Sequence, residues 1–172
     1  MRSVIKLNER WFYLPFDLPS GRPPRFRDSA WQEVDLPHTP GDGFPGRYWY
    51  CKAVHIERME GERVYLRVDG AGANCRLFAG GKEIEKLRAG SVSTVELTQY
   101  HRRTKPLQLA FRFRGGDDKA LGGFLRGLEL YVLPKSHFAF DAKGVWGVGS
   151  GARFDRPSAR IAITTASSRV SE

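Results

Sequence analysis

The stretch "ERVYLRVDG", residues 62–70, alternates apolar and polar side chains along its whole length. One set of positions holds Val64, Leu66 and Val68, and the other holds Tyr65, Arg67 and Asp69. A period of two is typical of a β-strand that buries one face. The closing Asp-Gly pair is a turn signal. The stretch therefore predicts a half-buried strand that ends in a turn.

Other stretches repeat this pattern. "PLQLAFRF" at 106–113 and "GLELYVL" at 127–133 alternate in the same way, and "YWYCKAVHIE" at 48–57 and "RIAITT" at 160–165 are rich in aromatic and β-branched residues. Such residues fit a pleated surface. Glycine-containing turns follow at 69–70, 79–82, 88–91 and 114–118, and an extended apolar period of 3.6 is absent from the sequence. We predict an all-β domain built as an antiparallel sandwich.

Two segments do not alternate. Residues 14–46 hold most of the prolines, so we expect a largely irregular segment that carries function or wraps the surface. The tail after Pro134 contains a glycine run at 144–151, which predicts a hinge, and then resumes strand character. A single strand there exposes unpaired backbone groups. It folds back on the sandwich, pairs with another copy, or continues into further chain, and we favour continuation.

Composition indicates one globular domain of ordinary size with room for an appendage, since 41% of the 172 residues are apolar and 12% aromatic. The sequence lacks the run of ~20 apolar residues that a membrane helix needs, so we expect no membrane partner. The first residues lack the apolar run of a signal peptide, and we expect a cytoplasmic protein.

The net charge of +9 is spread along the chain, and its densest cluster is "YHRRTK" at 100–105. We find neither a nucleic-acid-binding motif nor a row of stacking aromatic residues. We therefore interpret these charges as solvated surface and expect no nucleic-acid partner.

Cys51 and Cys75 are too few for a disulfide framework and lack the spacing of a metal site. We expect no bound metal and no cofactor. Each cysteine lies in a strand-like stretch, where a free thiol packs as a small apolar group. Two free thiols are the favoured prediction, and a single bridge between them is the alternative.

Six pieces of the sequence occur in an order that resembles a known family. They are "LNERWFYLPFD", "WQEVDLPHTP", "GRYWYCKAVHI", "VYLRVDGAGANCRLFAGGKEI", "LTQYHRRTKPLQLAFRF" and "GGFLRGLELYVLPKSHF". Together they look like the N-terminal sugar-binding domain of family 2 glycoside hydrolases, the β-galactosidase, β-glucuronidase and β-mannosidase group. The resemblance implies a galactose-binding-like jelly-roll sandwich over residues 1–138. It also implies that 139–172 form a linker and the partial first strand of a following immunoglobulin-like domain.

The matched positions have physical roles. Trp11, Trp31 and Trp49 are expected to be large core anchors whose indole N–H groups need partners. His38 follows "DLP" in an extended stretch without a serine or cysteine partner in view, so we expect it to bond the backbone rather than to act in catalysis.

The motif "GGFLRG" carries two further expectations. Arg126 is expected to pair with Asp69 or another carboxylate, because a guanidinium suits planar pairs. Gly122 and Gly123 are expected to supply a positive φ or a close backbone approach before the last strand.

The resemblance also implies a ligand contact. In the β-galactosidase and β-glucuronidase branches, an aspartate six residues before the second member of the small-residue–glycine pair reaches the sugar in the catalytic barrel. Counting back from Gly123 gives Asp117. A carboxylate there accepts hydrogen bonds from neighbouring hydroxyls. The substrate-binding set predicted on this basis is Asp117, Asp118, His38, Asp42 and Trp49.

Departures from the family argue for a second interpretation of this loop. "GGDD" at 115–118 is also an ordinary turn sequence, and the aromatic residues that the family often has after the aspartate are absent. Ala79-Gly80-Gly81 stands where the family's turn asparagine is usual. These differences weigh against a preserved ligand surface.

Catalysis in this family needs two glutamates about 5 Å apart on a (β/α)₈ barrel, which typically takes ~250 residues. The chain is too short to hold one, so we assign no catalytic residue and expect no hydrolysis by this chain alone. The favoured hypothesis is a non-catalytic accessory domain that helps to shape the sugar site of a parent glycosidase. Its expected partners are a β-glycoside carbohydrate and the remaining domains of that enzyme.

Two alternatives belong to other classes. The first is a free-standing carbohydrate-binding module in which a sugar stacks on an exposed aromatic residue such as Tyr48, Trp49 or Trp146. The second is a structural interaction domain. An exposed aromatic cluster would favour the module, and a bare apolar patch near residues 120–126 would favour a domain of a larger enzyme.

Overall fold

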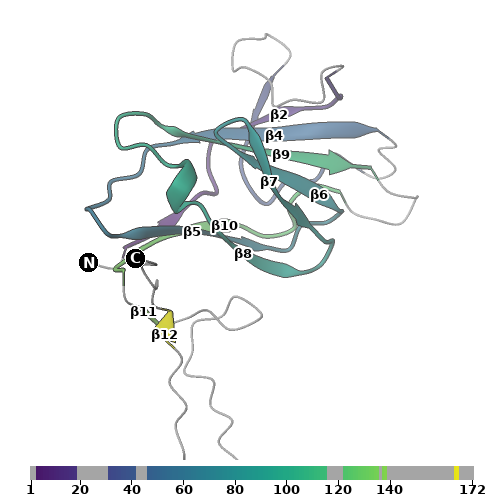
Figure 1. Cartoon of the computed structure of the whole chain (residues 1–172). Helices are drawn as coiled ribbons and strands as arrows, with labels where there is room; N and C mark the ends of the chain where they lie inside the picture. Colours follow the sequence, from purple (N-terminus) through teal and green to yellow (C-terminus); the bar gives the residue numbers. More distant parts are fainter. Residues whose placement is uncertain are drawn as a thin grey trace, which may run out of the picture.

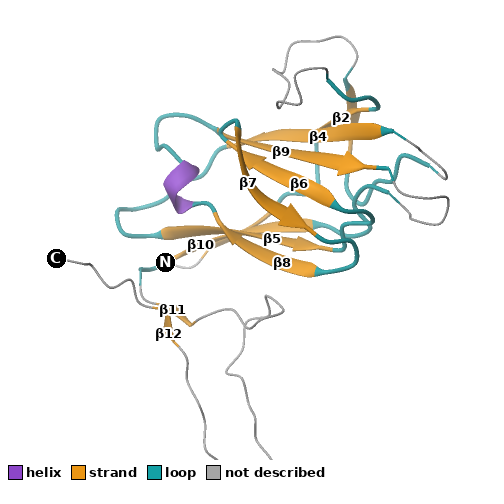
Figure 2. Ribbon diagram, turned by 45° about the vertical axis from the view of Figure 1, so that its right-hand side comes forward, coloured by secondary structure: helices purple, strands orange, loops and turns teal. Residues whose placement is uncertain are grey.

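The computed structural model describes residues 3–18, 31–41, 46–115, 122–135, 137–138 and 165–166. Two antiparallel sheets stack face to face, and apolar side chains fill the space between them (Figure 1). Figure 2 shows the same two layers after a turn of 45°. The prediction of an all-β antiparallel sandwich is confirmed.

The smaller sheet has four strands. In order across the sheet they are β1 (Ser3–Lys6), β10 (Leu128–Leu133), β5 (Arg63–Asp69) and β8 (Val92–Glu96). Leu66 of β5 lies opposite Leu130 on one side and Val95 on the other, so one face of the sheet is apolar. β5 and β10 match the strands predicted over 62–70 and 127–133.

The larger sheet has six strands. In order they are β3 (Gln32–Val34), β2 (Trp11–Leu14), β4 (Arg47–Val54), β9 (Leu107–Arg114), β6 (Cys75–Ala79) and β7 (Lys82–Leu87). Gly80 and Gly81 join β6 to β7 with φ values of +57° and +85°. A two-residue hairpin loop of type I′ requires a positive φ at both positions. The glycine pair therefore sets this turn.

The remaining elements are short. One 3₁₀ turn, η1 (Thr98–Tyr100), precedes β9, and β11 (His137–Phe138) pairs with β12 (Thr165–Ala166). Among the described residues, none of the helical structure is long and apolar enough to cross a membrane.

The core follows the predicted alternation. Val64, Leu66 and Val68 of β5 are at most 1% exposed and lie in the main cluster, as do Leu107, Leu109, Phe111 and Phe113 of β9. The intervening positions of β9 face outward, where Ala110 belongs to a separate cluster. Apolar side chains on one face of each sheet thus account for the two-layer architecture.

Two other sequence predictions concern segments that the structure describes only in part. Within residues 14–46, which were predicted to be largely irregular, Leu14 ends β2 and Gln32–Val34 form β3 along the edge of β2. β3 has three residues, which are too few to show an alternation in the sequence. It pairs with the edge of β2 that β4 leaves open. The strand predicted at 160–165 is seen at Thr165–Ala166, and the rest of it lies outside the described residues, as does the hinge at 144–151. The boundary between 1–138 and 139–172 stays a prediction.

Residues 122–125 connect the two sheets at one end of the sandwich. Phe124 and His38 exchange both backbone hydrogen bonds at 2.9 Å, while Gly72 N donates to Gly123 O at 2.8 Å and Leu125 N donates to Gly70 O at 2.8 Å. The Phe124 ring is fully buried, 4.9 Å from the Phe111 ring and 5.0 Å from that of Phe113. This segment closes the core and holds its neighbours on both sides.

The glycine pair before Phe124 leaves no room for side chains. Gly123 has φ +75°, and a Cβ there would lie 2.2 Å from the backbone oxygen of His38. A Cβ on Gly122 would lie 2.2 Å from the Tyr48 hydroxyl oxygen. Gly123 therefore shows both the positive φ and the close approach that the sequence led us to expect, and Gly122 shows the close approach.

Gly123→Ala is expected to lower the free energy of unfolding by about 3 kcal/mol or more, because it adds a left-handed penalty of ~1–2 kcal/mol to a backbone clash. Urea unfolding followed by tryptophan fluorescence measures the change. Gly90→Ala is the matched control, since Gly90 has φ +69° but an added Cβ there meets nothing within 4 Å. Equal losses for the two variants would show that the contact with His38 is not what constrains Gly123.

Candidate functional site

The segments that carry the predicted aspartates begin and end on one end of the sandwich. β4 begins and β9 ends there, with Arg47 opposite Arg114. Immediately beyond this pair, Gly115 N donates to Gly46 O at 2.6 Å. Segment 116–121 thus leaves the sandwich beside the point where segment 42–45 returns to it.

The other ends of the two segments also meet. A Cβ built on Gly122 would lie 3.2 Å from the Pro40 side chain, so the chain that precedes segment 42–45 touches the chain that follows segment 116–121. Asp42 stands on the first segment, and Asp117 and Asp118 stand on the second. These three aspartates lie outside the described residues, and their role stays a prediction.

His38 lies two residues before Pro40 and contacts Gly123 through its backbone oxygen. Its Nδ1 shares a hydrogen bond of 2.6 Å with the Tyr50 hydroxyl, and its ring centroid lies 5.0 Å from that of Tyr13. Burial lowers the pKa of His38 and raises that of Tyr50, so both groups are neutral near pH 7. The expected bond from the His38 ring to the backbone is replaced by this side-chain contact. It is the His38 main chain that bonds the backbone of Phe124.

Three buried tyrosines pack together beside His38. The Tyr13, Tyr48 and Tyr50 ring centroids lie 5.1 to 6.1 Å apart. The Tyr48 hydroxyl accepts a hydrogen bond of 2.8 Å from Gly123 N. Burial raises the pKa of Tyr48 to about 12, which keeps this hydroxyl protonated at neutral pH. The cluster positions the backbone at the base of the two acidic segments and holds no charge of its own.

Trp49 was predicted to touch ligand, and the structure corrects this. The side chain is fully buried on the outward face of the larger sheet, where it packs with Leu14, Cys51 and Phe78. Its Nε1 donates to Asp17 Oδ1 at 3.1 Å. Trp49 therefore acts as a packed anchor, as does the fully buried Trp11, whose Nε1 donates to Leu7 O. Trp31 is partly buried against the same outward cluster as Trp49.

The partner of Trp49 belongs to an ion-pair network that the sequence analysis missed. Asp17 Oδ1 accepts from Arg112 Nε at 2.9 Å, and Arg47 Nη1 lies 3.6 Å from Asp17 Oδ2. Burial alone would raise the pKa of Asp17, but hydrogen bonds from Arg112 and Trp49 outweigh it and the pKa is lowered. Asp17 and Arg112 are 95 positions apart in sequence, so no local pattern could have linked them.

Two other predictions are confirmed, one for an ion pair and one for the cysteines. Arg126 Nη1 lies 3.5 Å from Asp69 Oδ1, which ties the loop to β5. Cys51 and Cys75 are free and buried, and burial raises the pKa of Cys75 to about 12, so neither is a reactive thiolate. Within the described ranges, no three histidine, cysteine, aspartate or glutamate side chains gather as a metal site would require.

The lowered pKa of His38 predicts a pH-dependent stability. The unfolded chain takes up the proton near pH ~6.5, whereas the folded chain resists it to lower pH, so stability falls as the pH drops below ~6.5. His38→Gln is expected to make the fall in the urea midpoint between pH 7 and pH 5 shallower. The exposed His55→Gln should leave it unchanged. If the urea midpoint of His38→Gln falls with pH as steeply as that of the wild type, His38 is not the source of the pH dependence.

Comparison with known proteins gives one sequence relative and many structural ones. No family model matches the chain. A β-galactosidase of Thermoanaerobacter pseudethanolicus is 27% identical over 111 residues, which are 58% of this chain and 15% of the relative. The chain therefore matches less than a fifth of the curated relative's length.

Solved structures agree on the fold. A β-glucuronidase of Bacteroides uniformis superposes with a TM-score of 0.72 at 23% identity, over 81% of this chain and 19% of that one. A family 2 glycosyl hydrolase of Bacteroides cellulosilyticus superposes with a TM-score of 0.71 at 20% identity, over 80% of this chain and 22% of that one. The resemblance carried by the ordered motifs is thus confirmed, and the chain has the fold of a β-sandwich domain of the family 2 glycoside hydrolases.

Proposed function

We propose that this chain is a non-catalytic carbohydrate-binding domain of a β-galactosidase-like glycosidase, and that it helps to shape the sugar site of a separate catalytic barrel. One observation carries the proposal: segments 42–45 and 116–121, which hold Asp42, Asp117 and Asp118, are anchored side by side. Carboxylates are suitable acceptors for sugar hydroxyls. The small share of the β-galactosidase and β-glucuronidase chains that this chain matches supports a role as one domain of a larger enzyme.

The rigid base supports the same proposal. Binding groups are most effective when the elements that carry them are held in place. The hydrogen bond between Gly46 and Gly115 and the paired bonds between His38 and Phe124 fix the segment ends on backbone, not on mobile side chains.

The alternative of a free-standing module is less well supported. A free-standing module requires an exposed aromatic residue on which a sugar stacks, such as Tyr48, Trp49 or Trp146. Tyr48 and Trp49 are fully buried, and Trp146 lies outside the described residues. Among the described side chains the large exposed apolar ones are Val4, Phe16, Met59 and Leu125, and Phe16 is the one aromatic residue among them. They include no aromatic cluster.

Asp117→Asn tests the proposal in a polypeptide that joins this domain to a catalytic barrel, once the gene has been read past the Glu172 codon. Loss of a charged acceptor removes about 1.5–3 kcal/mol of binding, so KM for an aryl β-glycoside is expected to rise about 10- to 100-fold. Asp118→Asn is the matched control and is expected to change KM less than about threefold.

Two outcomes would count against the proposal. If the reading frame stops at Glu172, the role as a domain of an enzyme fails, and titration of this chain with neutral sugars tests the module instead. If Asp117→Asn and Asp118→Asn change KM equally, the loop acts as a turn and not as a ligand contact.

A further inference from the structure

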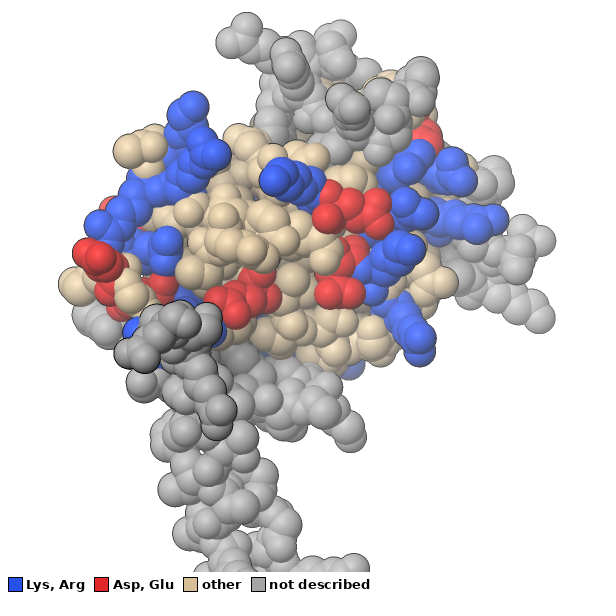
Figure 3. All heavy atoms as spheres, in the orientation of Figure 1, with Lys and Arg blue, Asp and Glu red and all other residues tan. Residues whose placement is uncertain are grey.

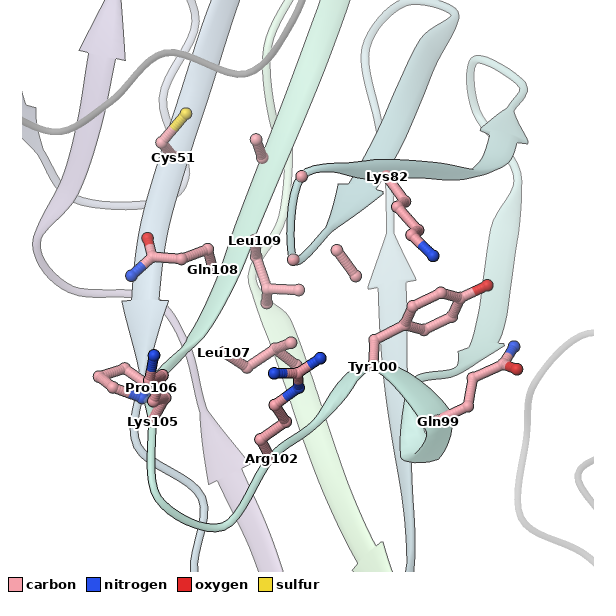
Figure 4. A pocket seen from close by; sticks show the side chains of 14 residues that line it. Cys51, Lys82, Gln99, Tyr100, Arg102, Lys105, Pro106, Leu107, Gln108 and Leu109 are labelled. Carbon is pink, nitrogen blue, oxygen red and sulfur yellow. The ribbon is translucent and has the colours of Figure 1, made fainter.

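A cavity of about 740 Å³ lies at the end of the larger sheet where β9 begins, between the Gly80–Gly81 turn and the loop that joins η1 to β9. Small apolar side chains, namely Cys51, Ala79 and Ala110, are among those that line it. Figure 4 shows Lys82 and Tyr100 on one side, Gln108 and Lys105 on the other, and Arg102 between them. Its volume falls in the range of about 300–1,000 Å³ that is usual for ligand pockets.

This pocket is separate from the acidic segments. It lies where β9 begins at Leu107, whereas those segments leave the sandwich where β9 ends at Arg114. The lining residue of β9 that is nearest to Arg114 is Ala110, four steps before it, and four steps along a strand span roughly 13 Å. A ligand in the pocket therefore would not contact the candidate sugar site.

The charged residues around the pocket are all positive. Lys82, Arg102 and Lys105 line it, no carboxylate does, and none of the three forms an ion pair with a carboxylate in the described part of the chain. Figure 3 shows Lys and Arg side chains gathered over the loop that follows η1. The "YHRRTK" cluster thus places positive charge without a partner carboxylate beside the small apolar lining residues. This favours a ligand with an anionic group.

The uncharged polar groups point to hydroxyl donors on the same ligand. Gln108 Oε1 is buried and accepts no hydrogen bond from any described residue. A buried acceptor without a hydrogen bond lowers the stability of the protein, and a ligand that donates a hydrogen bond to it recovers that free energy. Gln108 is itself one of the residues that line the cavity, and its terminal torsion is soft. The amide of Gln99 and the side chain of Tyr100 lie on the same rim.

We propose that this pocket is a second carbohydrate site, selective for an acidic sugar of the hexuronate class. Its carboxylate meets Arg102 and Lys105, while Lys82 adds positive charge from the other side of the pocket, and its hydroxyls donate to Gln108 and Gln99. A neutral sugar leaves the cations unmatched, and a simple anion leaves the Gln108 oxygen without a donor. This site goes beyond the proposed accessory role, because it lies at the other end of the sheet and needs no catalytic barrel.

Titration of the whole chain with D-glucuronate and with D-glucose, followed by calorimetry and amide NMR, tests the proposal. Glucuronate is expected to bind at least tenfold more tightly than glucose, with shifts at Gly80, Gly81 and residues 99–108. The double variant Arg102→Gln/Lys105→Gln should weaken glucuronate binding at least tenfold. Arg103→Gln is the matched control, because it removes a charge from the same loop but lines a different cavity, beside Glu57 and Glu60. It should change affinity less than twofold.

A third variant separates a sugar site from an anion site. Gln108→Leu should weaken glucuronate binding about fivefold or more and leave binding of inorganic sulfate unchanged, with thermal melting as the check on folding. Equal affinity for glucose and glucuronate would overturn the proposal, as would equal losses for Arg103→Gln and the double variant. Tighter binding of sulfate or of a single-stranded oligonucleotide than of glucuronate would also overturn it, and would assign the pocket to those anions instead.

Discussion

The close passage of Gly123 over His38 is the constraint on which this end of the sandwich depends. No Cβ fits between the two backbones, and the contact lets residues 122–125 bond the chain at His38 on one side and at Gly70 and Gly72 on the other. Phe124 enters the core at the same place and packs against β9. A larger residue at 123 would disrupt all of these contacts at once, because each of them depends on the position of residues 122–125.

The sheets depend less on any single residue. The main cluster draws apolar side chains from β5, β9 and β10, and each strand contributes alternate positions. Such a core tolerates the loss of one contact better than the glycine segment tolerates an added methyl group. Stability is therefore distributed over the two layers, while the geometry of the end that carries residues 122–125 depends on a few backbone contacts.

Local alternation in 62–70, 106–113 and 127–133 located β5, β9 and β10. The close approach at Gly123 and the Arg126–Asp69 pair join distant residues, and they were predicted from the motif "GGFLRG". Prediction failed where distant partners had no such motif. Trp49 looked like a ligand contact because its burial under the Asp17–Arg112 pair involves residues 95 positions apart. The cationic pocket was likewise invisible, since β7, η1 and β9 meet there only after folding, and the "YHRRTK" cluster was interpreted as plain surface.

The placement of the two cysteines has a practical consequence. Cys51 packs in the outward cluster under Phe78, whereas Cys75 faces the main core, so the larger sheet separates the two sulfur atoms. Both thiols are 3% exposed or less. An alkylating reagent can then reach Cys75 only when the two layers part, but it can reach Cys51 when the outward cluster alone loosens. The rate of alkylation of Cys75 thus reports on opening of the whole sandwich, and that of Cys51 reports on loosening of the outward cluster.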